Sequence, residues 1–250
     1  MKIPFLTVGH SLDVRDEDWL SIQSLINLCC TQTHAATMQL LQFRKFSEEY
    51  AWSGDREGEW LADRDAQLLI VRKFEGEFGQ PRPNAKQMRD LIAEAQKLHL
   101  QQEFEAGRTP RQLQHAAIFA HAEGFVINIH RVRSGISALG VFQGLENAAE
   151  AALGRVDEAL PHLNRVRNSI AHLDERILGL KNGKKRINTQ SPGIVVGNLS
   201  NEGYTTLCED GAQHTVPIDE PTLFLIRDAL QSVFDQLPLA VPGWLPSPSQ

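Results

Sequence analysis

Residues 167–172, with the sequence RNSIAH, combine reactive side chains at a spacing found nowhere else in this 250-residue chain. An arginine can hold a phosphate through its planar fork of N–H donors. A histidine titrates near neutral pH and can accept or donate a proton. An asparagine next to the arginine can orient either group by hydrogen bonding. Arg167, Asn168 and His172 are therefore the candidate catalytic residues.

These residues are expected on one helix, from about Asp157 to Leu178, with Pro161 in its first turn or at a kink. Apolar residues at spacings of three and four define a buried stripe on that helix: Leu163, Val166, Ile170, Leu173 and Ile177. Asn168 and His172 fall nearly opposite the stripe, one turn apart, and Arg167 lies on its flank. This placement argues against a core histidine. It leaves two interpretations, a solvated polar helix face or part of a site.

The rest of the chain predicts a mainly helical fold in a single domain, 1–250. Apolar periodicity indicates helices over about 16–46 (with a possible interruption at 31–33), 59–78, 85–98, 111–139 and a short segment after Gly144. Asn84 is the expected N-cap of the third helix. Gly124 and Gly135 are expected to weaken the fourth helix locally.

After the basic loop 181–186, short β-rich runs predict a small antiparallel meander within 190–217. Its expected strands are 194–196, 204–207 and 214–216, and its expected turns are 198–203 and 209–211. A last helix is expected over about 219–237. The segment 238–250 holds four prolines and is expected to be an extended tail.

Composition excludes several classes of protein. The formal net charge of −6 argues against a surface that is basic throughout. Three cysteines, an odd number without CxxC spacing, fit neither a disulfide framework nor a zinc site. No apolar run approaches the ~18 residues of a spanning helix, and the N-terminus lacks the apolar core of a secretory signal. We therefore expect a cytoplasmic protein with no membrane partner.

Three histidines share the helix expected over 111–139 with Glu123. His115 and His121 are six residues apart, and His121 and His130 are nine apart. Neither spacing brings two ligands together on one helix face, so no metal site is expected. Residues 130–133 (HRVR) could support the candidate site from a neighbouring helix or form a surface turn.

Two further patterns have ordinary explanations. Glu146 and Glu150 form an i, i+4 carboxylate pair without a matching ligand set. We expect both side chains to be solvated. The alternative is that they form an ion pair with a motif arginine. Residues 193–198 (GIVVGN) lack the lysine and the strand–helix context of a phosphate-binding loop.

The arginine–asparagine–histidine spacing on a late helix resembles the HEPN superfamily, whose helical domains carry an R-x4–6-H motif. The resemblance covers about 111–178, which would be the HEPN-like core. It implies a metal-independent endoribonuclease without a cofactor, in which two motif helices face each other across a homodimer. His172 would act as general base or acid for attack of the RNA 2′-hydroxyl, and Arg167 would stabilise the phosphorane-like charge. Asn168 would orient the histidine or the phosphate by hydrogen bonding.

The resemblance also implies candidate RNA-binding residues and partners. A basic rim could be formed by Arg165, Arg176, Lys181, Lys184, Lys185 and Arg186, although the same residues could be ordinary solvated charge. HEPN ribonucleases of the toxin or phage-defence type imply RNA and an antitoxin as partners. Two alternatives stay open: a non-catalytic HEPN-like module that binds a protein or nucleotide, and a helical protein in which the motif is coincidence.

Overall fold

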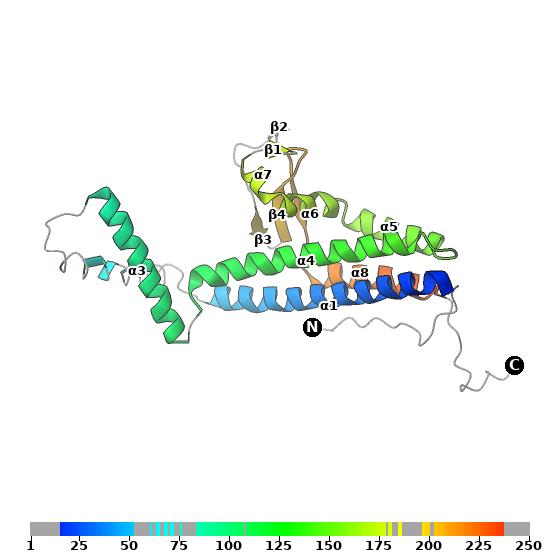
Figure 1. Cartoon of the computed structure of the whole chain (residues 1–250), viewed down its shortest axis with the longest axis horizontal. Coiled ribbons are helices and arrows are strands. Elements are labelled where there is room, and N and C mark those ends of the chain that lie inside the picture. Colours follow the sequence, from blue (N-terminus) through cyan, green and yellow to red (C-terminus); the bar gives the residue numbers. More distant parts are fainter. Residues whose placement is uncertain are drawn as a thin grey trace. The chain divides into compact units, whose positions relative to one another are not determined.

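The computed structural model is mainly helical, with a small three-stranded antiparallel sheet and a final helix, as the sequence predicts (Figure 1). It describes residues 16–52, 61, 64–65, 68–69, 71–72, 76, 84–107, 109–178, 180–181, 185–186, 197–200 and 203–237. The chain divides into two compact units, one formed by 1–43 with 119–250 and the other by 44–118. The candidate site lies in the first unit.

The second unit contains helix α3 (Ala85–Glu105). Asn84 caps it as predicted: its side chain accepts hydrogen bonds from the N–H groups of Lys86 and Gln87, and the Gln87 side chain accepts one from the N–H of Asn84. These bonds satisfy donors that have no partner inside the helix. The helix predicted over 59–78 falls mostly outside the described residues.

Helices α1 (Asp16–Trp52) and α4 (Arg111–Leu139) run antiparallel where both belong to the first unit. Cys29 lies against Gly135, whereas Gln39 hydrogen-bonds His121 Nδ1 at 2.7 Å, so residue numbers rise in opposite directions along the two helices. A Cβ at Gly135 would overlap the Cys29 sulfur, so glycine permits this close approach. The cost to helix propensity is thus offset by packing, and α4 runs through both of its glycines without a break.

The predicted interruption of α1 at 31–33 is wrong, because the helix is continuous there. The hydroxyl of Thr33 donates to the carbonyl of Cys29 at 2.9 Å, and that of Thr37 donates to the carbonyl of Thr33 at 2.9 Å. Bonding back to the preceding turn satisfies both buried hydroxyls without opening the helix.

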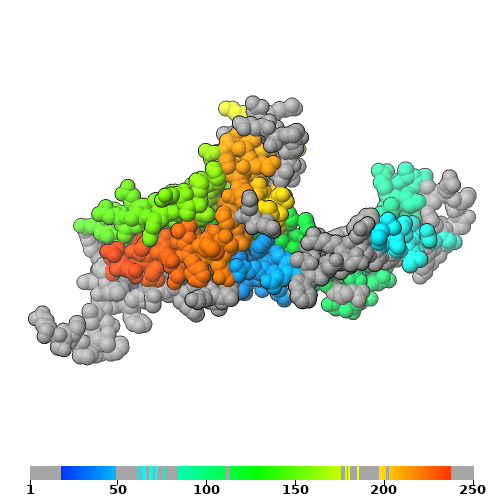
Figure 2. Space-filling model, turned by 180° about the vertical axis from the view of Figure 1, so that it is seen from behind, coloured from blue at the N-terminus to red at the C-terminus, as the bar shows by residue number. Residues whose placement is uncertain are grey.

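Helices α5 (Glu146–Ala159) and α8 (Glu220–Phe234) pack against each other (Figure 2). The predicted last helix is confirmed, and Asp219 caps it by accepting from the N–H of Thr222 at 2.8 Å. One face of α8 is buried in the core that α1, α4 and α5 also share; its members include Leu223, Ile226, Leu230 and Val233.

The antiparallel sheet has the order β3 (Asn198–Ser200), β4 (Gly203–Leu207), β5 (Gln213–Val216). The last two strands match the prediction. Strand β3 occupies residues that were expected in a turn. The strand expected at 194–196 lies outside the described residues. Tyr204 anchors the sheet to α4, since its buried hydroxyl donates to Glu123 Oε1 at 2.8 Å, and burial raises the pKa of this tyrosine.

The prediction that 181–186 forms a loop is only partly right, because strands occupy both of its ends. Leu180–Lys181 (β1) and Lys185–Arg186 (β2) pair as a short antiparallel hairpin. Residues 182–184 and the tail 238–250 lie outside the described residues.

Candidate functional site

The motif lies on α6 (Leu163–Ala171), a shorter helix than predicted. The predicted single helix over 157–178 is wrong. Helix α5 ends at Ala159, and Leu160, which precedes Pro161, adopts φ −126° and ψ 59°. A residue before proline is disfavoured in the helical region, which accounts for the break.

A second break places the histidine at the end of its helix. His172 is the C-cap of α6, with φ −121° and ψ 40°, and the short helix α7 (Leu173–Ile177) follows it. Its backbone N–H still donates to the Asn168 carbonyl at 3.1 Å. His172 is therefore held by the last turn of α6, although its own φ and ψ lie outside the helical range.

The predicted separation of apolar and polar faces is present in the structure. Leu163 and Val166 are buried, Ile170 is half-buried, and Asn168 and His172 are exposed. Ser169 joins the buried face, which the sequence did not indicate. Its hydroxyl has no hydrogen-bond partner among the described residues.

Arg167 and Asn168 form a pair on the solvent side of α6. The Arg167 guanidinium donates through Nη1 to Asn168 Oδ1 at 3.1 Å. Asn168 thereby holds one N–H group of the guanidinium and leaves other donors available for the oxygens of an anion such as phosphate. His172 Nδ1 lies 3.6 Å from Glu175 Oε1, and 55% of its side chain is exposed. Among the described residues of one chain, no side-chain hydrogen bond joins His172 to Arg167 or Asn168.

His130 of α4 also reaches this face of α6, so it lies in a helix beside the motif and not in a surface turn. Burial lowers the pKa of His130, a side-chain hydrogen bond with Asn164 raises it, and the charges of Arg167 and Arg133 lower it again. A second imidazole, with a lowered pKa, thus lies close to the motif arginine. Only the cluster of basic residues at 130–133 hinted at this neighbour, because the contact depends on tertiary packing.

Arg133 is itself fixed by a carboxylate of α5. Its Nε and Nη2 donate to the two oxygens of Asp157 at 2.6 and 2.5 Å. This fork-to-fork geometry raises the pKa of Arg133 and joins α4 to α5 next to the motif. The sequence offered no sign of this pair, whose members are 24 residues apart.

The predicted basic rim is only partly described. Arg165 forms an ion pair with Asp210, in the turn between β4 and β5. The Lys185 side chain is exposed, whereas the side chains of Arg176, Lys181, Lys184 and Arg186 lie outside what the structure describes. The structure thus pairs one rim residue with an acid of the same chain and leaves the RNA-binding role of the others a prediction.

The N-terminal end of α6 carries a cluster that the sequence did not reveal. His162 stacks on His214 with ring centroids 3.9 Å apart and an interplanar angle of 20°. His214 Nε2 is 2.8 Å from Asp210 Oδ2, the carboxylate that also holds Arg165. Helix α6 packs against both β4 and β5, which brings these distant residues together.

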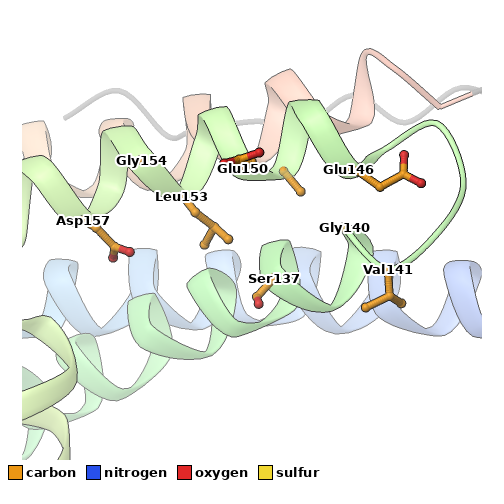
Figure 3. A pocket seen from close by; sticks show the side chains of 9 residues that line it. Ser137, Gly140, Val141, Glu146, Glu150, Leu153, Gly154 and Asp157 are labelled. Atoms are coloured by element: carbon orange, nitrogen blue, oxygen red, sulfur yellow. The ribbon is translucent and has the colours of Figure 1, made fainter.

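A groove of 430 Å³ lies between α5 and the end of α4 (Figure 3). Leu153 of α5 points into the space between the two helices. Glu146 and Glu150 line this groove, and Glu146 accepts a hydrogen bond from the N–H of Gly144 at 2.7 Å. The alternative that this carboxylate pair holds a motif arginine finds no support in these contacts.

Two kinds of arrangement are absent from the described residues. No group of three or more histidine, cysteine or acidic side chains is arranged there to hold a metal ion. No helix in the described part of the chain has the length and apolar character needed to cross a membrane. Comparisons with protein-family models, curated proteins and solved structures found no match to this chain.

Proposed function

We propose that the chain is a metal-independent endoribonuclease of the HEPN type that acts as a homodimer. Arg167, Asn168 and His172 of both subunits would form one composite site. A role as a toxin or in phage defence, with an antitoxin as partner, belongs to the same proposal. The observation that carries it is the hydrogen bond from Arg167 Nη1 to Asn168 Oδ1, at 3.1 Å. This pair lies on the solvent side of α6, the helix that ends at exposed His172.

The first support comes from where these side chains point. Arg167 is half-buried on the flank of α6, and Asn168 and His172 are exposed. Neither exposed residue contributes apolar packing to the core, which Leu163 and Val166 supply from the opposite face. The polar groups are therefore free to meet a ligand without disturbing the fold.

The second support is chemical. In the proposed reaction one histidine takes the proton of an RNA 2′-hydroxyl, and the 2′-oxygen forms a bond to the adjacent phosphorus. The bond from phosphorus to the 5′-oxygen breaks, and that oxygen takes a proton from a second histidine. Products are a 2′,3′-cyclic phosphate and a 5′-hydroxyl. The guanidinium of Arg167 would stabilise the extra negative charge on phosphorus oxygens during this exchange.

The need for a second proton donor supports the dimer. His172 lies at the C-cap of α6 and is exposed, whereas the other imidazole near Arg167, that of His130, is half-buried on α4. A two-fold related copy would bring His172 of the partner subunit to the same phosphate. That arrangement completes the acid–base pair with residues of one type.

The experiment compares wild type with His172→Ala on single-stranded and structured RNA in the presence of a metal chelator. We expect cleavage by wild type and a loss of about 100-fold or more in the variant, the range removed with a general acid–base group. His34→Ala is the matched control, because His34 is exposed on α1 in the same unit. Equal cleavage by wild type and His172→Ala would remove His172 from the mechanism.

The alternative, a non-catalytic module that binds a protein or nucleotide, is favoured by the acidic surroundings of His172. Glu175 lies 3.6 Å from the ring, and Asp174 is exposed beside it. Negative charge at this point disfavours a polyanion such as RNA. A wild-type dimer that leaves every RNA intact with and without chelator would support this alternative.

A further inference from the structure

The cluster at the N-terminal end of α6 joins two stretches of the chain, 162–165 and 210–214, through titratable side chains. His162 comes from the turn before α6, Arg165 from α6 itself, Asp210 from the β4–β5 turn and His214 from β5. Asp210 accepts from Arg165, from His214 and from the N–H of Ala212 at 3.1 Å. Asp210 is thus the negative group that contacts both Arg165 and His214.

The two imidazoles are stacked nearly parallel at 3.9 Å, and the side chain of His214 is only 14% exposed. His162 Nδ1 is buried and has no hydrogen-bond partner among the described residues. Protonation of both rings would place two positive charges face to face, next to the fixed positive charge of Arg165. One carboxylate, already shared with Arg165, cannot neutralise all three cations.

We propose that the His162–His214 stack is an acid-sensitive clamp, which holds the N-terminal end of α6 on the β4–β5 turn when neutral and releases it when both rings are protonated. The clamp stands independently of RNA cleavage. It would set the pH range in which the helix that carries 167–172 is held in place.

The direction of the pH effect follows from the groups that act on His162. Burial lowers the pKa of His162, and the charges of His214 and Arg165 lower it further, against Asp210, which raises it. A histidine with a lowered pKa in the folded state contributes stability that is fully present above its unfolded value near 6.5 and is lost as pH falls below it. The clamp should therefore hold at pH 7.5 and weaken toward pH 5.

The properties of Asp210 are consistent with its role as the counter-charge. Burial tends to raise the pKa of Asp210, but hydrogen bonds from His214 and Ala212, together with the charges of His214 and Arg165, hold it below its usual range. The carboxylate therefore stays ionised between pH 7.5 and 5.0, and it offsets only part of the positive charge of the cluster.

The test measures the equilibrium constant for unfolding of the full chain between pH 7.5 and 5.0, for wild type, His162→Phe and Asp210→Asn. Phenylalanine keeps an aromatic ring over His214 and removes one titrating group. We expect the rise in the unfolding constant on acidification to be severalfold smaller in His162→Phe than in wild type. It should be larger in Asp210→Asn, where the counter-charge is lost.

A control variant and a second measurement accompany this test. His34→Gln removes an exposed histidine elsewhere in the same unit and should leave the wild-type pH dependence nearly intact. Amide hydrogen exchange of α6, corrected for the intrinsic rate at each pH, should speed up on acidification in wild type and not in His162→Phe.

The clamp is overturned if His162→Phe and wild type lose the same stability between pH 7.5 and 5.0. Should a variant fail to fold, NMR titration of the two wild-type imidazoles decides the question. Coupled titration with at least one midpoint below the ordinary histidine range supports the clamp, and two independent titrations at the ordinary value overturn it.

Discussion

The two ends of α6 carry the same kinds of side chain and use them differently. At the N-terminal end, Arg165 and His162 contact Asp210 and His214, so their charge and ring surface are engaged within the chain. At the C-terminal end, Arg167 contacts its neighbour Asn168, and His172 is exposed. One end is built into the fold, and the other is available to a ligand.

This difference shows why residue type alone does not identify a site. Arg165 and Arg167 are two positions apart on one helix, yet only Arg165 meets an acid of the β4–β5 turn. The sheet therefore selects which arginine is neutralised. The proposed phosphate site is at the other end, where Arg167 contacts Asn168 and His172 lies 3.6 Å from Glu175.

The largest expected effect separates the two arginines by activity. Arg167→Ala should lower RNA cleavage by roughly 100- to 1000-fold, the range seen when a group that stabilises transition-state charge is removed. Arg165→Ala should keep most of the activity, because its guanidinium is already paired with Asp210. Equal losses in both variants would mean that the two ends of α6 serve one site.

The next effect concerns the anchoring of α6. Leu163 is 1% exposed, and Leu163→Ala should lower the free energy of unfolding by about 2–5 kcal/mol. Leu178→Ala, at a position 71% exposed just beyond α7, is the matched control and should change it by less than about 0.5 kcal/mol. Chemical denaturation measures the free energy of unfolding of both variants. Equal losses in the two variants would mean that the N-terminal end of α6 is not packed against the core.

A smaller effect is expected at the counter-charge of the N-terminal end. Asp210→Asn at pH 7 should cost about 1 kcal/mol, because this partly exposed carboxylate loses its ion pair with Arg165 and weakens its bond with His214. Adding Arg165→Gln to the variant should cost little more. A double-mutant cycle by denaturation checks this coupling, and additive losses would contradict it.

The smallest effect is expected at Ser169, in the middle of α6. Its hydroxyl is buried without a partner among the described residues, so Ser169→Ala removes an unsatisfied polar group. We expect the free energy of unfolding to stay the same or rise by up to about 1 kcal/mol. A loss beyond about 1 kcal/mol would show that the hydroxyl has a partner.

Local patterns in the sequence predicted most of the fold. Apolar periodicity placed α4 and α8 closely, and Asn84 was identified as a helix cap because its bonds are to its own chain neighbours. The antiparallel strands at 204–207 and 214–216 followed from short β-rich runs between turns. The split of the predicted motif helix was missed, although the proline at 161 marked where it occurs.

The surroundings of the candidate site could not be predicted in the same way. The faces of α6 followed from helix geometry, so the exposure of Asn168 and His172 was foreseen. The neighbours His130 and Asp210 reach α6 only after α4 and the sheet pack against it, and no local pattern encodes such contacts. Ser169 was missed for a related reason, because burial on a helix flank depends on what packs there.

The most direct test uses a DNA oligonucleotide with one ribonucleotide at a defined position, incubated with wild type and a metal chelator. The proposal predicts cleavage only after the ribonucleotide, with a 2′,3′-cyclic phosphate on one product and a 5′-hydroxyl on the other. It also predicts that His172→Ala leaves the oligonucleotide intact. Cleavage of the all-DNA control, or unchanged cleavage by His172→Ala, would contradict the proposed ribonuclease site.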